Sequence, residues 1–202
     1  MNFVLSLAVF SLAVAVHEYA HGLTAYWLGD RTAKYAGRLT LNPLAHIDPL
    51  GTILLPIILL ITGSPVIFGW AKPVPINYWG LRNPKKDIIW VGLAGPLANI
   101  GAAVILGLLM KINLGLSAFF VILIKQAILI NLVLAVFNLI PIPPLDGSRI
   151  LIGLLPSGAV KQYARVERWG FLILFILLYF RFFDYVIRPL VNLFLKIFKI
   201  DI

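Results

Sequence analysis

Long apolar runs alternate with short polar segments along this chain. Three of the runs, about 3–28, 87–110 and 116–140, have the length of a helix that crosses a bilayer. A fourth run, about 169–186, predicts a final span, and residues 188–202 have the mixed pattern of an amphipathic interfacial tail. The hydropathy pattern therefore predicts a bundle of membrane helices.

The apolar pattern is interrupted twice. Gly, Pro and β-forming residues are frequent from Ala36 to Asn77, and the apolar stretch Gly51–Gly63 within it is short for a crossing and contains Pro56. We expect a re-entrant or shallow segment here, flanked by short strands. A second interruption, the proline-dense Pro141–Asp146, precedes residues 149–155, which are expected to form half a span.

Composition strengthens the membrane interpretation. Hydrophobic residues make up 61% of the 202 residues, charged residues make up 12%, and the mean hydropathy is +0.97. A soluble domain has about twice that charged fraction. Because lipid-exposed backbone must satisfy its own hydrogen bonds, the fold must be helical. We predict an all-α polytopic membrane protein with about five to six membrane segments and a short β or re-entrant region after the first helix. It would form a single domain over 1–202, with its core motifs within 15–150 and a final span and interfacial tail within 157–202.

The net charge of +9 comes from Lys and Arg residues that lie mostly between or beside the apolar runs. In that position they orient a membrane protein and contact anionic lipid, so no nucleic-acid partner is expected. The positive-inside rule places the loops around Arg31, Arg82 and Arg165 on the cytoplasmic side. This topology requires that the stretch 51–63 does not cross completely.

The first apolar run contains the sequence His17-Glu18-Tyr19-Ala20-His21. On a helix, His17 and His21 share one face and can reach one metal ion, with Glu18 beside them as a general base for water. Ionisable side chains are costly in hydrocarbon, so such a cluster indicates a functional site. The alternative is a chance match, or three polar groups that face a neighbouring helix. Cys is absent, so any metal must be bound by His and carboxylate groups.

A catalytic zinc usually has three protein ligands, and the candidates for the third are His46, Asp48 and Asp146. His46 and Asp48 lie in a loop, where a cap or turn role is more typical. Asp146 follows three prolines that deny the backbone a regular helix at membrane depth, which is tolerated where it lines a polar cavity. Its alternative role is to cap the following helix. The predicted topology places His17 and Asp146 at similar depth, nearer the cytoplasmic face.

Three ordered motifs resemble those of the site-2 protease family of intramembrane zinc metalloproteases, particularly its bacterial members. They are residues 17–21, Gly95-Pro96-Leu97-Ala98-Asn99, and the stretch Asn138–Gly147, and the resemblance covers about 15–150. It implies that His17, His21 and Asp146 bind one zinc per chain and that Glu18 is the catalytic base. It also implies the fold of the family and cleavage of membrane-protein substrates within or near a transmembrane segment, in regulated intramembrane proteolysis. The chain has no room for the PDZ or CBS domains of many relatives.

The resemblance further implies a multi-pass protein of the bacterial cytoplasmic membrane, with lipids and substrate transmembrane segments as partners. Asn138 is a candidate to bond the substrate carbonyl or developing oxyanion, and ordinary interhelical hydrogen bonding is its alternative role. Asn99 is a second such candidate, within the polar cavity or in helix packing. The non-helical region 37–77 is expected either to receive an unwound substrate strand by β-addition or to act as a lid that controls water entry.

Two other classes of protein remain open from the residues alone. A polytopic transporter or ion-handling protein can also place His, Glu and Asp along a cation pathway, but it predicts repeated half-structures, which the sequence lacks. A non-catalytic membrane scaffold descended from an enzyme is the other, and the intact His17, Glu18, His21 and Asp146 argue against it.

Overall fold

Three long helices form the centre of the molecule. The computed structural model describes residues 3–63, 69–112 and 115–200, and the regular elements in these ranges are all helical. Three of them are long and apolar enough to cross a membrane: α1 (Phe3–Trp27), α4 (Pro84–Lys111) and α5 (Ala118–Asn138). At a rise of 1.5 Å per residue, α5 is about 32 Å long, close to the thickness of a hydrocarbon core. The prediction of an all-α fold with helices of membrane-spanning length is thus confirmed for the described residues.

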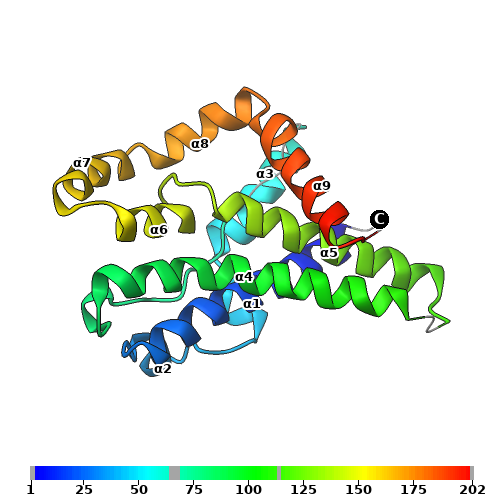
Figure 1. The fold of residues 1–202 in the computed structure, drawn as a ribbon. Helices are drawn as coiled ribbons and strands as arrows, with labels where there is room; N and C mark the ends of the chain where they lie inside the picture. The colour runs from blue at the N-terminus through cyan, green and yellow to red at the C-terminus, as the bar shows by residue number, and fades with distance from the viewer. Residues whose placement is uncertain (1–2, 64–68, 113–114, 201–202) are drawn as a thin grey trace.

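Helix α4 is the central helix of the bundle. It packs against α1, α5 and the short α6 (Asp146–Leu154), and Figure 1 shows it running between α1 and α5. One face of α4 carries a row of buried residues at helical spacing, in which only Asn99 is larger than alanine: Gly92, Gly95, Asn99, Ala103 and Gly107. Small residues let helix backbones approach closely inside a membrane bundle. The neighbours of α4 can therefore bring their side chains close to its axis.

The connection between α1 and α4 is compact and contains no strand among its described residues. Its helical elements are α2 (Thr32–Tyr35), η1 (Pro43–His46), η2 (Pro49–Leu54), α3 (Leu55–Ile61) and η3 (Tyr78–Gly80). Elements η2 and α3 form one short apolar helix, Pro49–Ile61, roughly 20 Å long and too short to cross the bilayer as a helix.

The short strands predicted between 36 and 77 are not found in the described part of this region; residues 64–68 lie outside it. Two isolated backbone contacts take their place: the Trp70 N–H donates to the Gly51 carbonyl, and the Lys72 N–H donates to the His46 carbonyl. A proline has no N–H to donate to a ladder, and prolines recur through this region. Local β propensity is therefore insufficient to build a sheet here.

The C-terminal part differs from the prediction of one span over 169–186. After α7 (Ser157–Glu167), the chain forms the ten-residue α8 (Gly170–Tyr179) and then bends. Arg181 adopts a left-handed backbone conformation (φ 58°) and pairs with Asp184 at 3.1 Å. This charged turn divides the apolar run, so that α8 by itself is about 15 Å long and does not have the length of a crossing.

Beyond the bend, η4 (Phe183–Ile187) and α9 (Arg188–Ile197) return to the bundle (Figure 1). The apolar face of this region is buried against α5 and α4 in the largest core cluster. Its buried members are Ala103, Ile128, Leu132, Val136, Ile187, Val191 and Ile200. Within the amphipathic tail predicted over 188–202, residues 188–197 form helix α9, and its apolar face packs on protein.

Candidate metal centre

Three buried side chains from two elements converge beside α4. His17 and His21 lie one turn apart on α1, and Asp146 is the first residue of α6. The His17 Nε2 and His21 Nε2 atoms are 2.9 and 3.0 Å from Asp146 Oδ2, and they are 3.0 Å from each other. Each residue is at most 6% exposed. Of the described residues, these three form the cluster of ligand atoms that could hold a metal ion.

The second nitrogen of each imidazole determines what the first can do. His17 Nδ1 lies 2.6 Å from Asn99 Oδ1, and His21 Nδ1 lies 2.6 Å from the Val91 carbonyl oxygen. Both partners are oxygens that can only accept, so each Nδ1 carries a proton, and in the neutral form of each ring, which a metal requires, Nε2 presents a lone pair. Histidine ligands of metals are typically held in this way.

The centre therefore consists of three acceptor atoms that face one another. Two imidazole lone pairs and a carboxylate oxygen repel unless a cation lies among them. Ligands at the usual distances from a tetrahedral zinc are roughly 3.3 Å apart. The observed separations of 2.9–3.0 Å are within a few tenths of an ångström of that value. The donor set and its spacing fit a zinc ion.

Gly95 on α4 leaves room for this centre. A Cβ atom at position 95 would lie 2.6 Å from His17 Nε2 and would also collide with His21 Nε2. Both rings are held at their Nδ1 atoms, so neither can move aside at low cost. The glycine of the Gly95-Pro96 motif is thus explained by close approach to the two histidines.

The proline-dense turn delivers Asp146 to the histidines. After α5 ends at Asn138, the turn leads into α6, which begins so close to the end of α5 that a Cβ at Gly147 would collide with the Leu139 and Ile140 carbonyls. Leu145, and not Asp146, occupies the N-cap position of α6. Asp146 Oδ2 faces the histidines, and Arg149 Nη1 donates to Asp146 Oδ1 at 3.0 Å. The carboxylate is oriented from both sides.

Glu18 lies next to this centre and is half-buried. The Val74 N–H donates to Glu18 Oε2 at 2.7 Å, so residues 69–77, which we call the strap, run directly over the carboxylate. The strap is also bonded at its ends, where the Trp70 N–H reaches Gly51 and the Asn77 N–H reaches Asp30. Neither proximity to the strap nor this backbone partner could be anticipated from the sequence.

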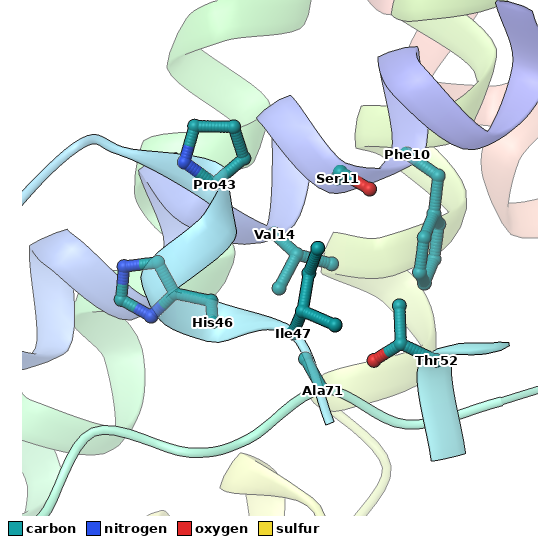
Figure 2. A pocket seen from close by; sticks show the side chains of 8 residues that line it. All are labelled: Phe10, Ser11, Val14, Pro43, His46, Ile47, Thr52 and Ala71. Carbon is teal, nitrogen blue, oxygen red and sulfur yellow. The ribbon is translucent and has the colours of Figure 1, made fainter. Parts of the chain in front are cut away.

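His46 and Asp48, the other candidates for a third ligand, lie elsewhere. His46 lines a small cavity together with Ser11 and Val14 of α1 (Figure 2). The volume of this cavity, about 10 Å³, leaves space for at most one water molecule. His46 Nε2 donates to the Thr40 carbonyl at 3.0 Å. Asp48 accepts from two backbone N–H groups at the start of η2. The structure therefore places both in local structural contacts.

The predicted asparagines have different surroundings. The Asn138 amide donates to the Leu134 carbonyl of its own helix at 3.0 Å. Asn99 is fully buried: its oxygen accepts from His17, and its amide donates to the Ala13 carbonyl and to Asn131 Oδ1, so its donors already have partners in this structure. Asn131, which the sequence reasoning missed, donates to the Ala127 carbonyl and accepts from Asn99. The available signal was an asparagine in the interior of the apolar run of α5.

A buried His–His–carboxylate centre, with a glutamate beside the first histidine and helices of membrane-spanning length around it, is the arrangement of a membrane-embedded metallopeptidase. The sequence comparisons agree with this class. The family model described as Peptidase family M50 matches residues 110–180. "Putative zinc metalloprotease YwhC" of Bacillus subtilis (strain 168) is 39% identical over 193 residues, covering 90% of this chain and 83% of that protein.

Two mycobacterial relatives carry the name "Putative zinc metalloprotease Rip2". The protein of Mycolicibacterium smegmatis (strain ATCC 700084 / mc(2)155) is 34% identical, and that of Mycobacterium tuberculosis (strain ATCC 25618 / H37Rv) is 28% identical. Each match covers 87% of this chain, and 67% and 66% of the respective relative. No solved structure matches significantly. This chain belongs to peptidase family M50, the site-2 proteases, and is a zinc metalloprotease.

Proposed function

We propose that this protein hydrolyses a peptide bond within or near a transmembrane segment of a membrane-protein substrate, with zinc bound by His17, His21 and Asp146. The observation that carries the proposal is the convergence of three acceptor atoms inside a helical membrane bundle, with Glu18 next to the first ligand. A transporter does not need a glutamate beside a histidine pair whose Nε2 lone pairs meet at one point.

The proposed chemistry divides between the metal and Glu18. Bound zinc supplies a Lewis acid that polarises the scissile carbonyl and acidifies water. Glu18 takes the proton from the attacking water and returns it to the leaving amine. We assign Asn138 to the substrate carbonyl: an asparagine amide has two N–H donors, and Leu134 uses one of them. Interhelical bonding by that second donor is its alternative role.

For substrate presentation, we propose that the strap acts as a lid and does not pair with an unwound substrate strand. Residues 73 and 75 are prolines on one edge of the strap, and on the other edge the N–H groups of Lys72 and Val74 already have acceptors. Few donors therefore remain for β-addition of a substrate. Because Val74 bonds the carboxylate of Glu18, we propose that the strap covers the base and shifts when substrate enters.

We further propose an arrangement in the membrane. Helices α1, α4 and α5 cross it, and the shorter Pro49–Ile61 and α8 enter without crossing, so that residues 1–202 form one membrane domain. The loops around Arg31, Arg82 and Arg165 face the cytoplasm of a bacterium, and the metal centre lies nearer that face. The Arg82 N–H donates to the Leu28 carbonyl at 2.9 Å, which holds the end of α1 and the start of α4 together.

Replacement of Glu18 with Gln tests the proposed reaction. The amide has the size of the carboxylate but is not basic, so hydrolysis of a reconstituted single-helix substrate is expected to fall by roughly 10²–10⁴. Zinc is expected to stay bound, because Glu18 is not a ligand. Elemental analysis and a cleavage assay on the same proteoliposomes measure both quantities. Cleavage at the parent rate by this variant would contradict the proposal.

The substrate itself offers a second arm of the experiment. A helical peptide bond is shielded by its own hydrogen bonds, so preferred substrates are expected to carry Gly, Pro or Asn near the cleavage depth. Replacement of these residues with Leu is expected to slow cleavage and to leave binding largely unchanged. Slower cleavage accompanied by an equal loss of binding would place their role in docking.

A further inference from the structure

Two buried asparagines link the metal centre to α5. Asn99 on α4 is 0% exposed, and Asn131 on α5 is 5% exposed, both within the apolar bundle. An amide buried in hydrocarbon without hydrogen-bond partners is strongly destabilising. Such residues need a compensating arrangement.

The hydrogen bonds of this pair run in one direction. His17 Nδ1 donates to Asn99 Oδ1 at 2.6 Å, Asn99 Nδ2 donates to Asn131 Oδ1 at 2.7 Å, and Asn131 Nδ2 donates to the Ala127 carbonyl at 2.8 Å. Asn99 Nδ2 also donates to the Ala13 carbonyl at 3.1 Å. Because a backbone carbonyl can only accept, the two backbone oxygens determine which way each amide points. The imidazole of His17 at the end of the line is thereby held with its proton on Nδ1.

We infer that Asn131 is a positioning residue for the metal ligand His17 and acts through Asn99. The inference rests on the proposed zinc site. It assigns a role to α5 that its sequence does not suggest: its apolar middle orients one ligand, and its C-terminal end leads into the turn that delivers Asp146. Helix α5 thus helps to position ligands on both α1 and α6.

The alternative role for Asn131 is general adhesion between helices. The chain contains a matched example of that role. Gln126, on the same helix, donates to Ser6 Oγ of α1 at 2.8 Å and is not a member of the metal cluster found among the described residues. Gln126→Leu therefore removes one hydrogen bond between α5 and α1 without touching the line to His17.

The experiment measures the affinity of the purified, micelle-bound full chain for Zn²⁺ by competition with a chromophoric chelator. The proteins are the parent, Asn131→Leu, Asn99→Leu, the double variant and Gln126→Leu. Loss of an outer partner of a metal ligand typically weakens binding roughly 10- to 100-fold. We expect a loss in this range for Asn99→Leu, a loss of about tenfold for Asn131→Leu, and no change for Gln126→Leu.

The double variant separates positioning from adhesion. If Asn131 acts only through Asn99, the double variant is expected to bind Zn²⁺ as weakly as Asn99→Leu and no more weakly. Co²⁺ bound in place of Zn²⁺ is expected to show an altered visible spectrum in Asn131→Leu and the parent spectrum in Gln126→Leu. Asn131→Ala, which introduces no bulk, replaces Asn131→Leu in every comparison if the latter does not fold.

Two failures can be told apart. If the parent protein does not bind one Zn²⁺ ion per chain, the proposed metal site itself is overturned. A parent that binds Zn²⁺ together with an Asn131 variant indistinguishable from Gln126→Leu would overturn only the positioning role. Losses that multiply in the double variant would also overturn it, because they would show that Asn131 acts independently of Asn99.

Discussion

His17 and His46 are both almost fully buried, yet only His17 is placed to bind a metal, and the difference lies in their second nitrogens. Each ring donates one proton to an oxygen, His17 to Asn99 and His46 to Thr40. The remaining lone pair of His17 meets those of His21 and Asp146. His46 Nδ1 has no hydrogen-bond partner among the described residues and lies outside the metal cluster. Burial alone therefore does not mark a ligand.

A prediction at this scale follows from that contrast. Asp146→Ala removes one of the three proposed ligands, so the zinc content of the purified protein is expected to fall from about one ion per chain to near zero after dialysis. His46→Ala, which also truncates a buried side chain, is expected to retain about one zinc. Elemental analysis of both variants measures the difference. Full zinc content in Asp146→Ala would reassign the third ligand.

At the scale of the element, α4 is shaped by what its glycines allow. Gly92 approaches Asp146, Gly95 approaches the two histidines, and Gly107 approaches Ile200, so one helix face serves the site and the C-terminal core together. The metal centre thus depends on how closely α1 and α6 approach α4. Contacts of this kind are sensitive to a single methyl group.

Two glycines of α4 provide a matched test. Gly95→Ala places a Cβ against both Nε2 atoms, and overpacking of a tight site costs about 1–3 kcal/mol, so zinc affinity is expected to fall roughly 10- to 100-fold. Gly101→Ala meets nothing within 4 Å, and alanine favours a helix over glycine by about 0.5–1 kcal/mol. Chelator competition and circular dichroism on both variants measure zinc affinity and helix content. Equal zinc affinity in the two variants would show that the imidazoles do not face Gly95.

At the scale of the whole molecule, the chain returns repeatedly to the end of the bundle where α1 stops. The Arg82 N–H reaches Leu28, and the Asn77 N–H reaches Asp30, so the whole connection from α1 to α4 begins and ends at one place. Those contacts require the helices α1 and α4 to run in opposite directions through the membrane. Packing thus supports the antiparallel arrangement of α1 and α4, and the distribution of Lys and Arg is the basis for the proposed cytoplasmic side.

Labelling of single cysteines tests this orientation in a chain that contains no native Cys. Tyr35→Cys and Trp79→Cys, at positions that are 77% and 89% exposed, and Gln162→Cys, also at an exposed position, are expected to react from the cytoplasmic side. Ser117→Cys, between α4 and α5, is the control and is expected to react from the opposite side. Labelling of Tyr35→Cys and Trp79→Cys from different sides would contradict the antiparallel arrangement and show that 51–63 crosses.

Much of the fold could be predicted because long apolar helices are local structures. Their hydrogen bonds join residues four apart, so the local sequence of runs such as 87–110 and 116–140 is sufficient to determine that they form helices. The last run shows the limit of this reasoning. Its hydropathy predicted one span over 169–186. Helix α8 instead ends just before the turn at Arg181, and α9 packs on α5. The energy of that packing comes from residues far away in the sequence.

The sequence by itself determined the apolar helices and the pairing of His17 with His21, because a spacing of four residues places two side chains on one helix face wherever that helix lies. It also limited the metal ligands to histidine and carboxylate groups. Only the tertiary structure decided that Asp146, 129 residues from His17, completes the cluster, that Val74 of the strap bonds Glu18, and that Asn131 bonds Asn99. These contacts depend on how closely α1, α5 and α6 approach α4, and close approach results from the packing of the whole bundle.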